Sequence, residues 1–517
     1  MLKTAVATTL LEIRPSGCSQ CWWFQNVRGL AQDQGPKASN VDPSTWVGMS
    51  KVWDWWDYLK GKSTKTPKVP KWKLKPPGPT KVELNSITKK YLAELYFTDA
   101  DFVLIKKMDL LFDHLTMYPE AVQYAVKIGC VDKLLDIRYR AVANNVKQQA
   151  CKLLSALGHA DPPKSRGVRI LSIDGGGMRG LSVIHMLKEI EILTQKKIID
   201  SFDLICGVST GAIIIGCMLP PVNMTLQQIE NVYKDCSTKV FDQSTIIGTG
   251  RMLWSHGYYD TLAWENLLQS YVGDTQLIDT AKHETCPKVF AVSSISVQSR
   301  VAPFIFRNYG NPKGLAGLDY YGTYSAKIYE TIRASSAAPT IFEEMRIDGI
   351  PHMDGGIVLN NPTALAIHEA KNLWPNEQIS CLVSCGTGLH DPVMTMEDLR
   401  ELSQQATSWK AILDKICASA TDTEAVHAAL NNLLVGNIYF RLNPPLSKYI
   451  VMDEVDKKNL ATLIEDTKMY CRRNREMFED LSHQLVLPRP KFQCAVDKAK
   501  LLYSLLKCKF NKEIRYK

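Results

Sequence analysis

The stretch FDLICGVSTGAIII, residues 202–215, decides the fold that we expect for this chain. An apolar run comes first, a glycine-flanked serine follows at position 209, and a second apolar run begins at Ala212. This order predicts a strand, a sharp turn and a helix, with the serine hydroxyl pointing away from the sheet. The start of the following helix favours negative charge that develops nearby. Ser209 is therefore the candidate nucleophile, in an elbow made of Gly207, Val208, Thr210 and Gly211.

Short apolar runs and helical patterns alternate on both sides of this stretch. The runs have the length of buried strands and lie at Val168–Ile173, Phe202–Val208, Val289–Ile295 and Ile379–Ser384. Alternation of this kind indicates an α/β fold with a largely parallel sheet.

A second glycine-rich motif, Asp174-Gly-Gly-Gly-Met-Arg-Gly180, lies between the first predicted strand and a predicted helix. Amides at a helix start bind anions, and three kinds of site use this property. A P-loop would need a lysine where Leu181 stands. A dinucleotide loop would need an acid at the end of the next strand, whereas Asp200 precedes that strand. An oxyanion hole accounts for both motifs in one unit, with amides from Gly175, Gly176, Gly177, Met178, Arg179 and Gly180.

A third motif supplies a candidate base, because a serine hydroxyl is a weak nucleophile without one. Asp354 stands in a turn with Gly355 and Gly356, and this turn could reach the elbow. The usual base is a histidine that a carboxylate orients, and a triad of that kind is not excluded by count. None of the histidines that follow Asp354 sits in a glycine-flanked loop; they are His368, His390, His427 and His483. No metal-ligand motif accompanies these residues: His368-Glu369 lacks the second histidine of HExxH, since Asn372 holds that place.

The three motifs, in the order in which they occur along the chain, resemble those of the patatin-like phospholipase family, and within it the calcium-independent phospholipases A2. Further stretches carry the same resemblance, which covers roughly residues 100 to 480: Phe304-Ile-Phe-Arg-Asn-Tyr-Gly310, Arg333-Ala-Ser-Ser-Ala-Ala-Pro339 and Ser384-Cys-Gly-Thr-Gly388.

The resemblance implies a three-layer α/β/α hydrolase domain and a catalytic dyad without histidine. Ser209 would be the nucleophile, Asp354 the base, and the glycine-loop amides the oxyanion hole. The implied reaction needs neither calcium nor another cofactor, and it releases a fatty acid and a lysophospholipid from a glycerophospholipid through an acyl-enzyme. Two alternatives stay open, namely a neutral-lipid lipase or transacylase with the same dyad, and a non-catalytic lipid-binding scaffold.

The chain divides by composition and pattern into four parts. Residues 1–81 are a basic arm and linker rich in Trp, Pro and Lys, and 82–165 are a helical segment that resembles part of an armadillo repeat. Residues 166–367 are the expected patatin-like domain, and 368–517 are a mostly helical C-terminal extension of the catalytic unit.

The positive charge of the chain belongs to the arm. The whole chain carries a net charge of +9, and residues 1–81 supply +8 of it, from 13 Lys and Arg against 5 Asp and Glu. The remaining residues are almost neutral, which speaks against a nucleic-acid partner. The charge and tryptophans of the arm instead predict a phospholipid membrane surface as its partner. The sequence indicates no oligomeric state.

We expect an intracellular protein that is peripheral to a membrane. Met1–Leu11 lacks acids, which leaves a mitochondrial transit segment open, and the endoplasmic reticulum is another candidate. The terminal residues Ile514-Arg-Tyr-Lys517 differ from a Ser-Lys-Leu signal, which speaks against the peroxisome.

Deleting residues 1–81 should weaken binding to anionic vesicles, because Lys60–Lys81 holds eight lysines and Trp53, Trp55 and Trp56 precede it. Tryptophan favours the lipid headgroup region, and each lysine near an anionic surface contributes at most about 1 kcal/mol. The difference between the full and shortened chains should shrink as salt is added. Vesicle co-sedimentation measures it, with hydrolysis of a soluble short-chain ester as the control that should change little. Equal binding of both forms at low salt would contradict a membrane role for the arm.

Overall fold

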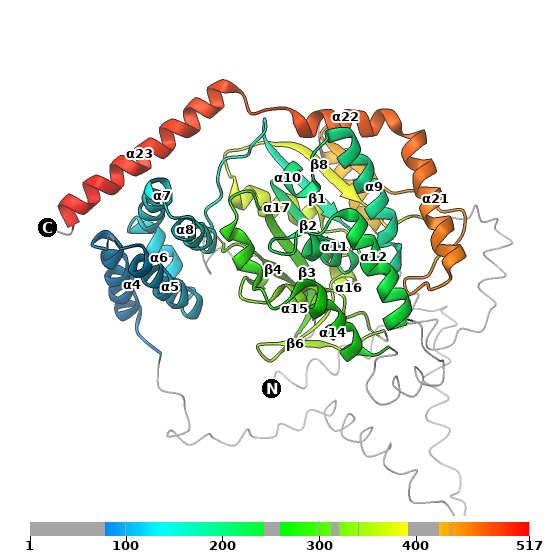
Figure 1. Cartoon of the computed structure of the whole chain (residues 1–517), viewed down its shortest axis with the longest axis horizontal. Helices are drawn as coiled ribbons and strands as arrows, with labels where there is room; N and C mark the ends of the chain where they lie inside the picture. The colour runs from blue at the N-terminus through cyan, green and yellow to red at the C-terminus, as the bar shows by residue number, and fades with distance from the viewer. Residues whose placement is uncertain are drawn as a thin grey trace, which may run out of the picture. The chain divides into compact units, whose positions relative to one another are not determined.

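The structure is a computed structural model that describes residues 78–98, 100–241, 259–298, 300–311, 320–339, 341–390, 423–434 and 436–515 (Figure 1). The tryptophan cluster and nearly all of the basic linker lie outside the described residues. The described residues from Pro79 onward belong to one compact unit. No helix among the described residues is long and apolar enough to cross a membrane.

Five helices precede the sheet: α4 (Lys81–Tyr96), α5 (Asp101–Met117), α6 (Ala121–Lys127), α7 (Cys130–Arg140) and α8 (Asn144–Ala156). The first begins at a capping box, in which Thr80 and Glu83 satisfy each other's backbone amides. These helices share a core of their own, built on side chains such as Met108, Leu111 and Leu134. The last of them, α8, contacts the catalytic unit, where the Ser155 carbonyl accepts the Gly310 amide at 2.8 Å.

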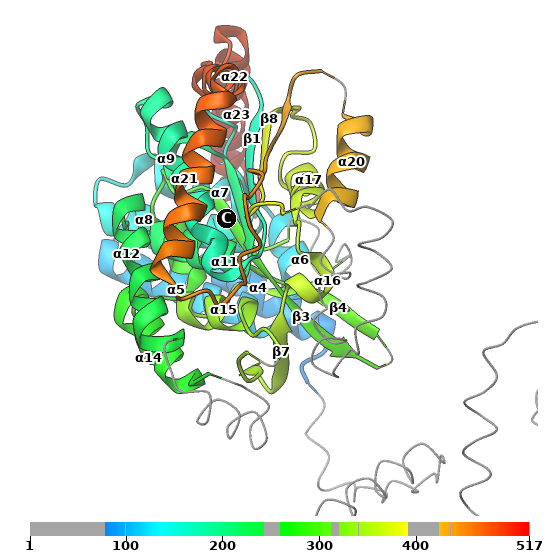
Figure 2. The same ribbon diagram turned by 90° about the vertical axis from the view of Figure 1, so that its right-hand side faces the viewer.

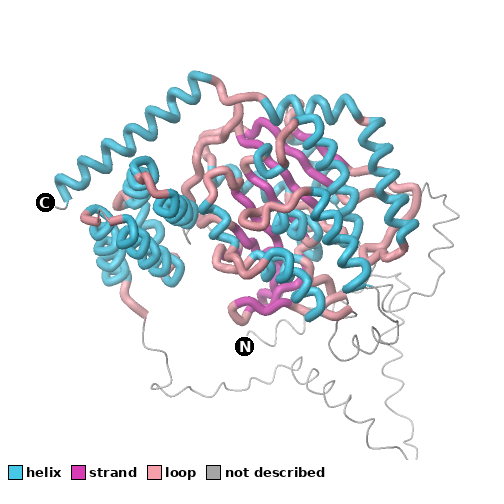
Figure 3. The backbone as a smooth tube through the Cα atoms, in the orientation of Figure 1, coloured by secondary structure: helices cyan, strands magenta, loops and turns pink. Residues whose placement is uncertain are grey.

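One sheet organises the rest of the unit (Figure 3). Its strands run in the order β5-β4-β3-β2-β1-β8-β9, and β7 pairs with both β3 and β6. From β3 to β9 along this order, neighbouring strands are parallel, whereas β4 and β7 are antiparallel to β3. The bounds are β1 Val168–Ile173, β2 Leu204–Val208, β3 Lys288–Val297, β4 Arg300–Arg307, β5 Tyr321–Thr323, β6 Met345–Ile347, β7 Ile350–Asp354, β8 Ile379–Cys385 and β9 Tyr439–Leu442.

Strand β3 brings β2 and β7 end to end along one of its edges. Val208, the last residue of β2, pairs with Val292, and Asp354, the last residue of β7, pairs with the next residue, Ser293. Because β2 runs parallel to β3 and β7 runs antiparallel to it, both strands end at the same point. The sheet therefore places residue 209 beside residue 354.

Helices cover both faces of this sheet, so the expected three-layer α/β/α fold is confirmed (Figure 2). In β1, Leu171 and Ile173 point into one core and Ile170 points into the other, as the two-residue period of a strand requires. The first core is covered by α9 (Gly180–Thr194), α11 (Thr210–Met218), α12 (Leu226–Cys236), α21 (Lys457–Arg473) and α22 (Arg475–Val486). The second is covered by α17 (Thr363–Leu373).

The C-terminal residues contribute strands to the sheet as well as helices. Position 367 falls inside α17, and β8 and β9 follow it. The remaining helical elements are η3 (Gly177–Arg179), α10 (Ile198–Ser201), η4 (Ser237–Phe241), α14 (Thr261–Val272), η5 (Leu277–Lys282), α15 (Ile328–Ser335), α16 (Gly356–Leu359), α20 (Thr423–Leu433) and α23 (Lys491–Arg515).

Candidate active site

Ser209 occupies a strained turn between β2 and α11. Its φ of 51° and ψ of −109° are rare for a residue with a side chain, and such strain gathers at functional positions. The turn is also tightly packed, because a Cβ on Gly211 would meet the Ile173 carbonyl oxygen at 2.6 Å. The amide of Ser209 donates to Ser335 Oγ at 2.9 Å, and that hydroxyl donates to the Val292 carbonyl at 2.6 Å. A buried serine from α15 therefore holds the elbow against β3.

Asp354 ends β7 with its carboxylate buried. Its Oδ1 accepts the Gly356 amide at 2.7 Å, and its own amide donates to the Ala337 carbonyl at 2.8 Å. Burial raises the pKa of Asp354 to about 6, against the opposing effects of the Gly356 amide and the Ser209 side chain. The next residue must be glycine, because a Cβ on Gly355 would lie 2.2 Å from the Val292 carbonyl oxygen. This carboxylate is thus poised to accept a proton near neutral pH.

The glycine loop lies beside the elbow, and most of its amides already have acceptors. The Gly175 amide donates to Asn360 Oδ1 at 3.0 Å, and the Met178 amide donates to the Met452 carbonyl at 2.7 Å. The amides of Arg179 and Gly180 donate to carbonyls within the loop. Those of Gly176 and Gly177 have no acceptor among the described residues. Of the six candidate oxyanion donors, these two have no described acceptor, and Gly177 also lines the cavity that holds Ser209.

Side chains tie the glycine loop to the elbow and to the sheet. Thr210 Oγ1 donates to the Gly177 carbonyl at 2.8 Å and also contacts the Tyr233 hydroxyl. On the other side of the loop, Thr387 Oγ1 donates to the Gly175 carbonyl at 3.2 Å. The loop is therefore held on one side by the elbow that follows β2 and on the other side by the residues that follow β8.

A buried ion pair lies directly before the loop. Arg441 on β9 approaches Asp174 Oδ2 at 2.8 Å and Glu424 Oε1 at 2.9 Å. Burial raises the pKa of Asp174 to about 6, although the Arg441 guanidinium opposes this shift. Breaking a buried pair by removing one partner is strongly destabilising, since the remaining charge stays uncompensated. The pair thus fixes the point where the loop leaves β1.

Ser209 and Asp354 line one cavity of about 60 Å³. The rest of its wall is largely apolar, and it consists mainly of Met178, Ile213, Tyr233, Phe241, Trp264, Ile341, Phe342 and Met452. A largely apolar wall lowers the local dielectric constant and so strengthens electrostatic interactions inside the cavity.

No histidine among the described residues lines this cavity. His368 Nε2 lies 3.0 Å from Asn372 Nδ2, and His427 Nδ1 lies 3.1 Å from the Tyr439 hydroxyl. His390 Nδ1 lies 3.1 Å from the Leu446 carbonyl. His352 is nearest to Asp354 in sequence, but it packs against Phe304, and burial lowers its pKa to about 4. In the part of the chain that the structure describes, no group of three His, Cys, Asp or Glu could hold a metal ion.

The structure brings together Ser209, Asp354 and the glycine loop, which the sequence analysis had singled out. It also shows positioning residues that the analysis missed, namely Ser335, Asn360, Thr387 and Arg441. Their common signal is a polar residue inside a buried or glycine-rich stretch. Two of these stretches, Arg333–Pro339 and Ser384–Gly388, had been noted only for their resemblance.

A model of the family described as patatin-like phospholipase matches residues 171–367. Residues 171–367 form a patatin-like phospholipase domain. The resemblance seen in the sequence is confirmed, and β8 and β9 extend the sheet of this patatin-like phospholipase domain beyond the matched residues.

Relatives extend the similarity to most of the chain. Human calcium-independent phospholipase A2-gamma is 40% identical over 424 residues, which cover 81% of this chain and 53% of the relative. Phospholipase A I of Arabidopsis thaliana is 32% identical over 380 residues, covering 62% of this chain and 28% of the relative. The chain thus spans about half the length of the phospholipase A2-gamma relatives. The crystal structure of VipD from Legionella pneumophila matches with 14% sequence identity and a TM-score of 0.31. The match covers 62% of this chain and 67% of the VipD chain.

Replacing Ser335 with alanine should destabilise the patatin-like domain by about 1–3 kcal/mol, because the Ser209 amide loses its acceptor. Ser201→Ala is the matched control. Its buried hydroxyl donates to the Lys197 carbonyl, which also accepts the Asp200 amide and so stays satisfied. Urea unfolding measures both losses, and a loss for Ser201→Ala as large as that for Ser335→Ala would contradict the role given to Ser335.

Proposed function

We propose that this chain hydrolyses fatty-acyl esters of glycerophospholipids at a Ser209–Asp354 dyad, without calcium. The observation that carries the proposal is the placement of both residues in one apolar cavity at the meeting point of β2 and β7. The substrate class follows from the relatives, whose names describe calcium-independent phospholipases A2. The substrate lies in a phospholipid membrane surface, to which the protein binds peripherally.

The first step forms an acyl-enzyme. Asp354 accepts the proton of the Ser209 hydroxyl while its oxygen attacks the ester carbonyl carbon. The carbonyl oxygen becomes negatively charged in the tetrahedral intermediate. The amides of Gly176 and Gly177 donate to it, and the start of α11 adds a favourable field. The intermediate collapses, and the lysophospholipid alcohol leaves with the proton that Asp354 held.

The second step releases the fatty acid. Asp354 accepts a proton from a water molecule, whose oxygen attacks the acyl carbonyl. The same two amides stabilise the second oxyanion, and Ser209 leaves with the proton. The acyl chain lies among apolar side chains such as Ile213, Trp264 and Phe342.

Ser209→Ala and Asp354→Asn should each lower turnover by at least about 10⁴-fold, because one removes the nucleophile and the other the base. His368→Ala and His427→Ala are the matched controls, and both should keep full activity. Products from mixed phospholipids and triacylglycerol, identified by mass, measure the outcome. If Asp354→Asn stays active while one of the histidine variants is inactive, the proposed dyad is wrong and a triad that contains this histidine is right.

The same assay separates the alternatives. Fatty acid released only from triacylglycerol would indicate a neutral-lipid lipase, and acyl transfer to an alcohol would indicate a transacylase. Lipid binding without any product would indicate a scaffold.

Activity should fall on the acid side of about pH 6, because burial raises the pKa of Asp354 from 3.8 to about 6 and only the ionised form accepts a proton. Below that pH, kcat/KM should decrease by about tenfold per pH unit. A soluble ester removes any effect of vesicle binding, and circular dichroism over the same range controls for unfolding. A kcat/KM that stays constant down to about pH 3.8, the ordinary pKa of an aspartate, would contradict the role of Asp354 as the base.

A further inference from the structure

The C-terminal helix α23 presents an apolar stripe to solvent. The outer stripe consists of Phe492, Val496, Ala499, Tyr503, Leu506 and Phe510, spaced alternately by four and three residues. This spacing puts all six on one side of a helix. Four large members are strongly exposed, at 79% for Phe492, 68% for Tyr503, 64% for Leu506 and 63% for Phe510. Large apolar side chains gathered in this way mark an interaction surface.

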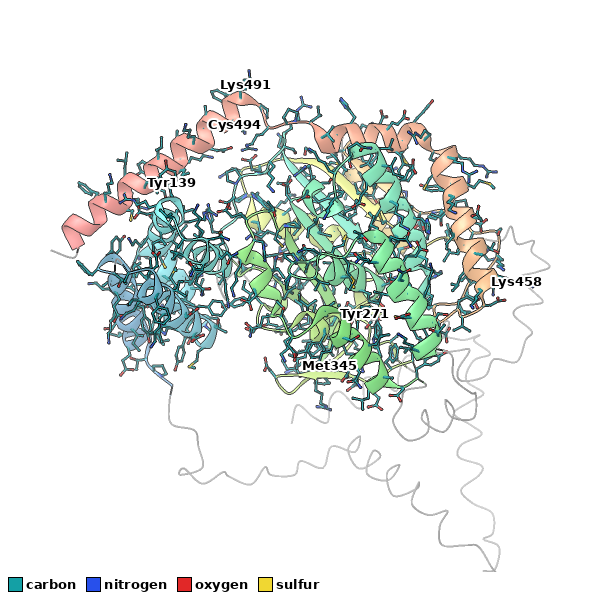
Figure 4. All side chains as sticks on the ribbon, viewed as in Figure 1. Tyr139, Tyr271, Met345, Lys458, Lys491 and Cys494 are labelled. Atoms are coloured by element: carbon teal, nitrogen blue, oxygen red, sulfur yellow. The ribbon has the colours of Figure 1, made fainter. Side chains whose placement is uncertain are left out.

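The orientation of α23 is fixed from its opposite side. Leu505 and Cys508 are buried against the helical segment, and α23 packs along α7 (Figure 1). Ser504 donates to Asp132 of α7, and Lys507 pairs with the same carboxylate at 2.8 Å. Near the start of α23, which Lys491 and Cys494 mark in Figure 4, Arg489 pairs with Asp497 at 2.6 Å. The outer stripe therefore faces away from the protein.

Lysines border the outer stripe on both sides. Residues 491–510 hold five lysines and one acid, Asp497, which pairs with Arg489. By helical geometry Lys500 and Lys507 flank one side of the stripe, and Lys491, Lys498 and Lys509 flank the other. A second copy of α23 would carry the same excess of lysines, and like charges that approach one another repel. The stripe thus fits a partner that is apolar in the middle and anionic around it.

We propose that α23 lies in the headgroup region of an anionic membrane, with the outer stripe inserted and the flanking lysines on the lipid phosphates. An exposed aromatic and aliphatic face bordered by lysines is how interfacial helices bind lipid. The proposal rests on the proposed function only in that the substrate occupies such a surface. Binding by α23 requires no catalysis.

The test is co-sedimentation of the full chain with vesicles, in a Ser209→Ala background that leaves the lipids intact. Vesicles of phosphatidylcholine alone are compared with vesicles that also contain phosphatidylserine. The stripe variant carries Leu506→Ser and Phe510→Ser, and the flank variant carries Lys498→Gln and Lys500→Gln. The matched control is Phe102→Ser on α5, whose side chain is 80% exposed outside the stripe.

The stripe variant should bind phosphatidylserine vesicles about tenfold more weakly than its parent, because buried apolar area is lost. This loss should persist at raised salt, which screens the charges of the basic arm. The flank variant should lose affinity only for phosphatidylserine vesicles, and Phe102→Ser should bind like the parent. Since all these residues are exposed, circular dichroism should be unchanged.

Stripe and control variants that bind vesicles equally would overturn the proposal. It fails in the same way if the stripe variant abolishes self-association, or binding of an acidic protein helix, while vesicle binding stays unchanged. Vesicle binding through the stripe by a chain that releases no fatty acid would instead overturn the proposed function and leave this inference standing.

Discussion

The register of β3 is the constraint on which the candidate site depends. Val292 pairs with the end of β2 and Ser293 with the end of β7, so adjacent residues of one strand set the separation of Ser209 and Asp354. A shift of either partner by one residue would turn its side chains to the other face of the sheet. Ser335 reinforces this register, because its hydroxyl bridges β3 and the elbow. Backbone pairing and one buried hydroxyl therefore set the relative position of the two residues of the proposed dyad.

The glycine loop is positioned by a different principle, since no strand register reaches it. Its amides and carbonyls are bonded one by one to side chains and carbonyls of the surrounding elements, including Asn360, Thr387 and Thr210. Buried backbone polar groups must find partners. The amides of Gly176 and Gly177 have no acceptor among the described residues, and they are therefore the candidate donors to a bound substrate. Satisfying the rest of the loop fixes the direction in which these two point.

The sequence could predict the strands that carry local signals, and it could not predict the long-range ones. Four apolar runs foretold β1, β2, β3 and β8, because each is buried on both faces and therefore reads as a continuous apolar stretch. By contrast, β7 carries Pro351, His352 and Asp354, and only its pairing with β3 makes it a strand. For the same reason the sequence could offer Asp354 as a base only through its glycine-rich turn. Ser335 and Arg441 act across the sheet, at a sequence distance that no local pattern encodes.

The burial that raises the pKa of Asp354 also costs stability. An aspartate with an ordinary pKa is a weak base at neutral pH, and burial brings Asp354 closer to the range where proton transfer is efficient. A folded-state pKa raised from 3.8 to about 6 means that the folded protein holds this proton more tightly than the unfolded chain. The associated stability is present at low pH and is lost as pH rises through about 6, which amounts to about 3 kcal/mol for the ionised carboxylate. The buried hydrogen bonds of Ser335, the glycine loop and the Asp174–Arg441 pair surround the site that bears this cost. These contacts hold the surroundings of a buried carboxylate that itself accepts the Gly356 amide.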